Sequence, residues 1–187
     1  MRGGIAIGAT LEAASRDAWR RWLRRNHRRA AEIWLINPKK ASGEARIPYH
    51  DAVEEALCFG WIDSTNKTID AEHTAQRFTP RRKGSPLSPM NRERVRRLVA
   101  AGRMTEAGLR AIGGPPAAGR LTIASDIRAA LHADPAAWRN FQRFAASYRR
   151  IRIGWIEGAR RRPAEFRKRL AYFVKMTAAN KQYGMVR

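Results

Sequence analysis

Cysteine and histidine are scarce in this chain, which has one cysteine, Cys58, and four histidines among its 187 residues. A single thiol excludes a disulfide framework and any zinc site built from several cysteines. The histidines, at positions 27, 50, 73 and 132, lack the i,i+4 spacing of a helical metal site. We therefore expect no metal and no cofactor, and we expect Cys58 in LCFGW to be a buried small residue.

Long apolar runs are also missing. No stretch reaches the roughly eighteen apolar residues that a transmembrane helix needs. The apolar start of the chain is interrupted by Gly8 and ended by Glu12, so it lacks the long apolar core of a signal peptide. We expect a cytoplasmic protein. No Walker loop, G-x-G-x-x-G, nucleophile elbow or H-E-x-x-H motif is present, which lowers the expectation of an enzyme.

Acidic residues are few, with 16 Asp and Glu against 38 Lys and Arg, so the net charge is +22. Arginine supplies 31 of the cations and lysine 7. This charge excludes an ordinary neutral enzyme surface and points to polyanions: nucleic acid, anionic lipid headgroups or phosphorylated small molecules. Arginine is suited to these because its guanidinium contacts phosphate bidentately. The alternative is a coding bias toward arginine, which would place many of these residues on solvated helix faces.

The first part of the chain alternates helical and strand patterns. Ser15 caps a predicted helix over 16–29, whose apolar face contains Trp19 and Trp22. Its opposite face consists of Arg20, Arg21, Arg24, Arg25 and Arg28. The segment 32–37 predicts a strand, and a further helix runs from Pro48 to the stop at Gly60. The segments GWIDSTNKTID and HTAQRFTP predict two more strands, which would complete a small antiparallel sheet.

The remaining pattern is helical. A helix opens at Ser88 and Pro89 with Val95, Leu98 and Val99 facing inward, and Thr105 caps a short helix over 106–112. The segment GGPPAAG, residues 113–119, predicts a linker. Four more helix starts follow it, at Ser125, Asp134, Ser147 and Pro163. We therefore predict an α+β fold that is predominantly helical, with an α+β domain over 1–115 and a helical domain over 120–187.

Three segments occur in order within residues 48–109: EALCFGWID, RFTPRRKGSPLSPMN and GRMTEAG. They resemble the YdeI/OmpD-associated family, also called the bacteriocin-protection family, and the flanking WRRWLRRNH and AAWRNFQ stretches are similar to it as well. Three positions depart from the family pattern: Leu87 and Leu121 stand where Trp is usual, and Arg160 where Lys is usual. The resemblance implies a role in resistance to bacteriocins or cationic antimicrobial agents, and for some members association with an outer-membrane porin. It implies no established reaction.

The strongest local pattern is a basic loop directly before a helix. The candidate anion-binding residues are Arg77, Arg81, Arg82, Ser85, Ser88 and Asn91, with Lys83 among them. A helix N-terminus attracts anions, and neighbouring arginines hold a phosphate bidentately. The competing interpretation is that Ser88 only caps the helix while Arg77 pairs with Asp63 or Asp70 across the hairpin.

Trp61 and Asp63 form the candidate wall of the same pocket, because alternation along a strand places both side chains on one face. In that position Asp63 would orient a ligand group or act as a general base. The competing interpretation is a hairpin salt bridge beside a packed tryptophan.

Residues 121–187 carry 15 basic and 4 acidic groups and are the denser polycation. The candidate polyanion-binding residues there, which we name the C-terminal polycation, are Arg149, Arg150, Arg152, Arg160, Arg161, Arg162, Arg167, Lys168 and Arg169. Basic helices with interleaved aromatics, here Tyr148, Trp155 and Phe166, grip phosphate backbones without sequence selectivity. A solvated helix face is the competing interpretation.

Three function hypotheses follow. The first is a non-enzymatic binder of phosphate-rich polyanions, in particular nucleic acid, linked through the family resemblance to bacteriocin or antimicrobial-peptide stress. The second is an enzyme that acts on a small anionic metabolite in a pocket near Trp61, Asp63 and Arg81. The third is an interaction module that docks an acidic protein partner or a membrane surface.

Overall fold

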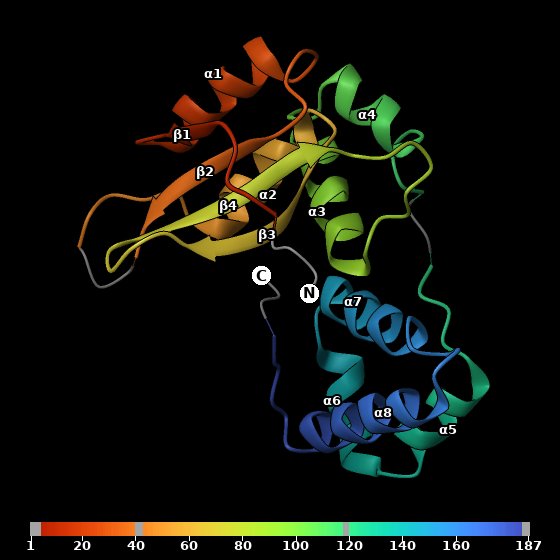
Figure 1. Ribbon diagram of the computed structural model, residues 1–187. Coiled ribbons are helices and arrows are strands. Elements are labelled where there is room, and N and C mark those ends of the chain that lie inside the picture. The colour runs from red at the N-terminus through yellow and green to blue at the C-terminus, as the bar shows by residue number, and fades with distance from the viewer. Residues whose placement is uncertain (1–4, 40–42, 118–119, 185–187) are drawn as a thin grey trace. The chain divides into compact units, whose positions relative to one another are not determined.

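The computed structural model describes residues 5–39, 43–117 and 120–184. The chain forms two compact units (Figure 1). The first unit comprises Met1–Pro86 and Arg94–Pro116, and the second comprises Leu87–Glu93 and Ala117–Arg187. Helices and one small sheet confirm the predicted α+β class and the predominance of helix over strand. The predicted domains 1–115 and 120–187 stay a prediction.

The sheet of the first unit has the strand order β1-β2-β4-β3. Its strands are β1 (Thr10–Glu12), β2 (Ile33–Pro38), β3 (Trp61–Thr68) and β4 (His73–Pro80). The predicted strands pair antiparallel, β4 with β2 and with β3. The sheet is nevertheless mixed, because β1 joins its edge parallel to β2. A strand of three residues carries too short an alternation to be recognised in the sequence.

Two helices, α1 (Arg16–Asn26) and α2 (Tyr49–Cys58), provide much of the core beside this sheet. The hydroxyl of Ser15 caps α1 by accepting a hydrogen bond from the Ala18 amide. Trp19 is fully buried: its ring lies 5.2 Å from that of Phe78 on β4 and its indole N–H donates to the Ala52 carbonyl. The predicted apolar stripe of α1 is therefore the face that packs. Of the predicted arginine face, Arg21, Arg24, Arg25 and Arg28 are exposed, while Arg20 is half-buried.

Helix α3 (Pro89–Ala100) begins in the second unit and continues into the first, and α4 (Glu106–Ile112) belongs to the first. Val95 and Leu98 are buried as predicted, but Val99 is 37% exposed, so its predicted inward orientation is wrong. Helix α4 lies very close to the end of α2. A Cβ built on Gly108 would be 2.3 Å from the Cys58 carbonyl oxygen, so only glycine permits this approach.

The regular elements of the second unit are helices, and no strand occurs among its described residues. Its helices are α5 (Ser125–His132), α6 (Pro135–Arg143), α7 (Ala146–Glu157) and α8 (Pro163–Ala178). The Asp134 carboxylate caps α6 through the amides of Ala136 and Ala137. The core of the four helices consists of Ile127, Leu131, Ala137, Phe141, Phe144, Tyr148, Ile153, Ile156 and Phe173.

The predicted linker 113–119 follows α4. Gly113 ends that helix in the left-handed conformation, with φ of 76°, which glycine adopts without strain. Two of the linker residues, 118 and 119, lie outside the described residues. Throughout residues 5–39, 43–117 and 120–184, no helix combines the length and the apolar composition of a membrane span.

Candidate anion-binding surfaces

Arg77, the first residue of the predicted loop site, is engaged on the sheet. It lies on β4, where its Nε donates to the Glu32 carboxylate at 2.8 Å and its Nη2 contacts the same oxygen. The Arg77 hydrogen bond lowers the pKa of Glu32 below its usual value. The competing interpretation anticipated an ion pair for Arg77, but with Asp63 or Asp70, and the partner in the structure is Glu32.

Arg81 is turned back onto its own loop. Its Nη2 donates to the carbonyls of Ser85, at 2.8 Å, and Pro86, at 3.2 Å. Its Nε is buried and has no hydrogen-bond partner, and desolvation lowers the pKa of the guanidinium. Arg82 and Lys83 are exposed, and neither side chain forms an ion pair within the described residues. Arg82 thus remains available to an anion, while Arg81 mainly shapes the loop.

Ser88 and Asn91 belong to the second unit. The Ser88 hydroxyl accepts a hydrogen bond from the Asn91 amide at 3.2 Å, which is the predicted cap of α3. The Asn91 side chain is nearly buried and is engaged within the protein. Of the predicted anion-binding set, Arg82, Ser85 and Ser88 are exposed. Ser88 nevertheless caps α3, and the Ser85 carbonyl accepts a hydrogen bond from Arg81.

Trp61 and Asp63 have partners on the neighbouring helices. The Trp61 indole N–H donates to the His27 carbonyl, and its ring meets Trp22 edge-on at 5.8 Å. Asp63 accepts a hydrogen bond of 2.7 Å from the Tyr49 hydroxyl. Burial and this bond raise the pKa of Tyr49 to about 12. Asp63 therefore holds a phenol, rather than the hairpin salt bridge of the competing interpretation.

The C-terminal polycation is divided between structural and free cations. Arg150 pairs with Glu93, Arg160 with Asp126 and Glu157, and Arg169 with Glu165. Arg152 is buried, with its guanidinium 4.4 Å from the ring centre of Tyr183, and Arg149 lies 5.6 Å from the Phe141 ring. The exposed members whose side chains form no hydrogen bond or close ion pair in the described chain are Arg161, Arg162, Arg167 and Lys168.

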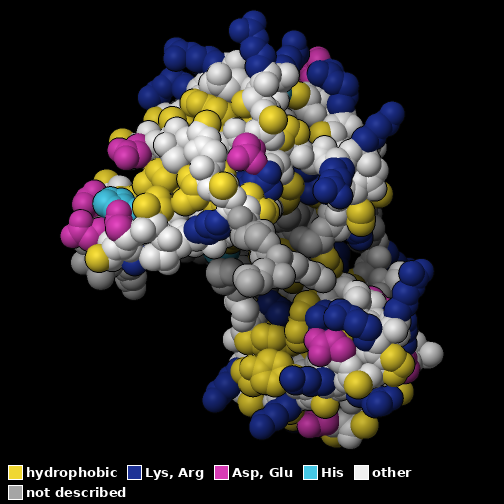
Figure 2. All heavy atoms as spheres, in the orientation of Figure 1, with side chains coloured by type: hydrophobic (Ala, Val, Ile, Leu, Met, Phe, Trp, Pro, Cys, Tyr) yellow, Lys and Arg dark blue, Asp and Glu magenta, His cyan; other side chains and the backbone are white. Residues whose placement is uncertain are grey.

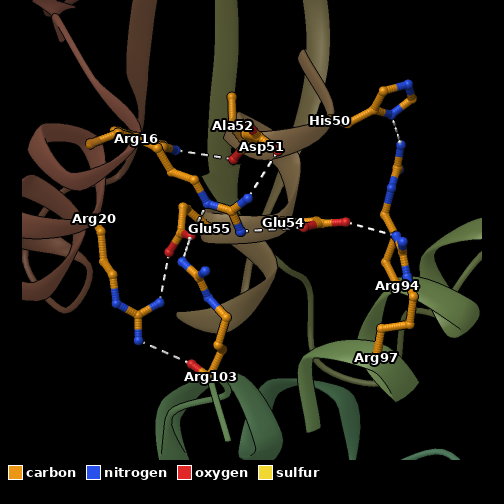
Figure 3. A network of polar contacts seen from close by, with 11 residues as sticks. Arg16, Arg20, His50, Asp51, Ala52, Glu54, Glu55, Arg94, Arg97 and Arg103 are labelled. Atoms are coloured by element: carbon orange, nitrogen blue, oxygen red, sulfur yellow. Dashed lines mark hydrogen bonds and ion pairs between the residues drawn. The ribbon is translucent and has the colours of Figure 1, made fainter. Parts of the chain in front are cut away.

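A buried carboxylate in the first unit was not anticipated as a central element (Figure 3). Glu55 on α2 has no exposed surface, and three arginines surround it. Arg16 Nε lies 2.5 Å from its Oε1, Arg20 Nη1 lies 2.6 Å from its Oε2, and Arg103 pairs with Oε1. A buried charge is tolerated when it is paired in this way.

The same network extends along α2 (Figure 3). Glu54 pairs with Arg16 and, at 2.8 Å, with Arg97. Arg94, which is 5% exposed, donates from Nη2 to His50 Nδ1 at 2.6 Å, so this histidine nitrogen acts as the acceptor. Burial lowers the pKa of Arg94. The acidic residues of α2 are thus paired with several of the arginines. The sequence contains a signal for these ion pairs, because an arginine-rich segment over 16–25 is followed by an acidic helix.

Four arginines at and just after the end of α1 are not part of this network. Arg24, Arg25, Arg28 and Arg29 are exposed, and in the described part of the chain their side chains form no ion pair or hydrogen bond. Figure 2 shows the Lys and Arg side chains projecting from the upper end of the first unit, over α1. The run RRWLRRNHRR signals this density, but the predicted site residues did not include it.

The single cysteine of the chain lies in the core of the first unit. Cys58 is buried as predicted, and desolvation raises its thiol pKa to about 11, which disfavours the reactive thiolate. Within the described residues, no group of three or more His, Cys, Asp or Glu side chains is placed to hold a metal ion. What the surfaces offer instead is exposed guanidinium groups.

The structure thus defines an α+β protein with more arginines than acidic residues. Arginines without an acidic partner lie at its surface. Residues 11–111 match a domain of unknown function (DUF8412), and the chain belongs to that family. Residues 120–180 match the family described as bacteriocin-protection, YdeI or OmpD-associated, which confirms the predicted family over this part of the chain. The three segments that suggested the resemblance lie within the first match. No curated protein and no solved structure matches the chain.

Proposed function

We propose that this chain is a non-enzymatic, cytoplasmic binder of phosphate-rich polyanions, and of nucleic acid in particular. One observation carries the proposal: exposed cations remain without a close ion pair after the acids have been paired. They include Arg24, Arg25, Arg28 and Arg29 in the first unit and Arg161, Arg162, Arg167 and Lys168 in the second. Arg82, in the predicted loop site, is a further one.

The physical reason is the cost of like charges at close range. Arginines one helical turn apart repel each other and destabilise a helix slightly. A polyanion removes this repulsion, and its bound counterions are released into solution, which favours binding. The guanidinium also contacts phosphate oxygens bidentately. Such contacts position a nucleic acid but do not read its bases, so the binding is independent of sequence.

The family descriptions suggest a setting for this activity. The family that residues 120–180 match is described by bacteriocin protection and by association with OmpD. We therefore place the proposed binding in the response to bacteriocin or antimicrobial-peptide stress. The enzymatic alternative near Trp61, Asp63 and Arg81 is not favoured, because those side chains are held by His27, by Tyr49 and by their own loop.

The test is a titration of the full chain with a labelled DNA duplex of random sequence at several salt concentrations. The affinity should fall steeply with salt, with a log–log slope of about −0.9 for each phosphate neutralised. A second duplex of different sequence should bind equally. Binding that is absent at low salt, or indifferent to salt, would overturn the proposal. Salt-dependent binding to anionic vesicles with none to DNA would instead point to a membrane surface.

A further inference from the structure

A pocket of about 620 Å³ opens between the end of α1 and the start of α4, within the first unit. Six arginines line it: Arg20, Arg24, Arg25, Arg28, Arg29 and Arg110. None of the predicted site residues is among its lining residues. The pocket is therefore a separate feature from the loop before α3.

The charge of this pocket is poorly balanced by the protein. Glu106 is its one acidic lining residue, and it pairs with Arg110 at 3.1 Å. Arg20 is held by Glu55 and lies 5.3 Å from the ring centre of Phe59. The other four arginines are the unpaired ones at the end of α1. Four arginines without an ion pair thus line one hollow, whose single carboxylate, Glu106, is paired with Arg110.

A second observation concerns His27, which also lines the pocket. Its Nδ1 donates to the Leu23 carbonyl at 2.9 Å, since a carbonyl oxygen only accepts. Its Nε2 is buried and has no hydrogen-bond partner. A buried polar atom without a partner costs free energy, so a ligand that reaches Nε2 after a shift of the neighbouring side chains is favoured. Nε2 either accepts from a phosphate hydroxyl or, once protonated, donates to a phosphate oxygen.

We propose that this pocket binds a short oligophosphate chain, such as a triphosphate group. Several guanidinium forks around a hollow match a compact ligand with several adjacent negative charges, because each fork takes two oxygens. A single orthophosphate would engage only a few of them. The chain can come from an inorganic oligophosphate or from a nucleoside triphosphate. The inference does not depend on nucleic-acid binding, which involves exposed cations of both units.

The experiment is isothermal titration calorimetry of the full chain with inorganic tripolyphosphate, pyrophosphate and orthophosphate. We expect one tripolyphosphate per chain and an affinity that rises with the number of phosphates. The pocket variant Arg24→Ala/Arg28→Ala should lose about tenfold in affinity for each arginine removed, the equivalent of one charged hydrogen bond. Both side chains are exposed, so the melting temperature without ligand should stay unchanged.

Two controls separate a pocket from a general charge effect. Arg161→Ala/Arg167→Ala removes the same charge from exposed positions of the second unit, and Arg21→Ala removes an exposed cation of α1 that does not line the pocket. Both should keep tripolyphosphate affinity within about twofold, because salt screens exposed charges that do not contact the ligand. Equal losses in the pocket and control variants, or several weak equivalents per chain, would overturn the proposal.

The source of the phosphate chain is distinguished by adenosine triphosphate. Equal affinity for ATP and tripolyphosphate means that the phosphates alone are recognised, and tighter binding of ATP adds the nucleoside to the ligand. Failure of ATP and tripolyphosphate alike would overturn the pocket without affecting the DNA titration. Conversely, loss of DNA binding with intact tripolyphosphate binding would overturn only the function proposed above.

Discussion

The guanidinium of Arg150 meets the carboxylate of Glu93 through two hydrogen bonds, 2.9 Å from Nε to Oε1 and 2.7 Å from Nη2 to Oε2. The Glu93 side chain is 8% exposed, so the pair is largely shielded from water. The bond to Glu93 raises the pKa of Arg150. A residue predicted to contact a polyanion is therefore committed to connecting α7 with the start of α3.

Replacing Arg150 by alanine should consequently destabilise the protein. We expect a loss of about 1.5–3 kcal/mol in the free energy of unfolding, the range for hydrogen bonds to a charged group. Arg161→Ala is the matched control, since Arg161 is exposed and makes no such pair, and it should change stability by less than about 0.5 kcal/mol. Urea denaturation of both variants measures this, and equal stabilities would contradict a structural role for Arg150.

Glu55→Gln should be among the more damaging single changes in the first unit. It leaves Arg16, Arg20 and Arg103 without the buried charge that they share. Breaking a buried ion pair from one side costs about 3–5 kcal/mol. Glu106→Gln is the control, because its pair with Arg110 is exposed and contributes only about 0.3–0.5 kcal/mol. If the Glu55→Gln variant is as stable as the unaltered protein, the ion pairs around Glu55 do not support the fold.

The pair of Glu32 with Arg77 predicts a pH dependence. The pKa of Glu32 in the folded protein is lowered, chiefly by the hydrogen bond from Arg77. The stability from this pair is therefore present above the pKa of Glu32 in the unfolded chain, and it is lost as the pH falls through the lower folded value. A carbon-detected NMR titration should find this carboxyl below its usual pKa, and Arg77→Ala should return it upward. An unchanged titration in the variant would contradict the pairing.

Arg81 and Arg82 should respond differently to replacement by alanine. Loss of Arg81 removes the bonds to the carbonyls of Ser85 and Pro86 and should cost about 1–2 kcal/mol of stability. Loss of Arg82, which is exposed, should leave the melting temperature unchanged and reduce the DNA salt slope by about 0.9 if it contacts one phosphate. Thermal melts and salt titrations of both variants check this. A slope changed by Arg81 alone would reverse the assignment.

Much of the fold followed from local signals in the sequence. The helix stripes, the Ser15 and Thr105 caps and the stop at Gly60 placed most elements within a few residues of their bounds. Helix α1 ends at Asn26, earlier than the predicted residue 29. The parallel strand β1 was missed, because its pairing is a long-range contact and three residues show no period. Val99 was misplaced, since periodicity alone does not tell which edge of a stripe faces the core.

The candidate sites were harder to predict, because a sequence shows charges but not their partners. Arg77 and Glu32 lie 45 positions apart, and Arg150 and Glu93 lie 57 apart. Only the folded chain shows that these pairs use up some of the predicted cations. The same accounting reveals the free arginines at the end of α1, which the sequence displayed as an arginine face without indicating a hollow.

The contact between Gly154 and Pro89 has a consequence for how this protein can be divided. A Cβ on Gly154 would lie 2.7 Å from the Pro89 ring, so α7 is fitted to a segment that precedes it by many residues. Residues Leu87–Glu93 accordingly belong to the helical unit although they fall inside the first family match. The helical unit is therefore not one continuous segment of the sequence. A gene fragment that begins after the linker would encode four helices without the segment that packs on α7. Recombination that exchanges the whole unit must transfer two separate segments together.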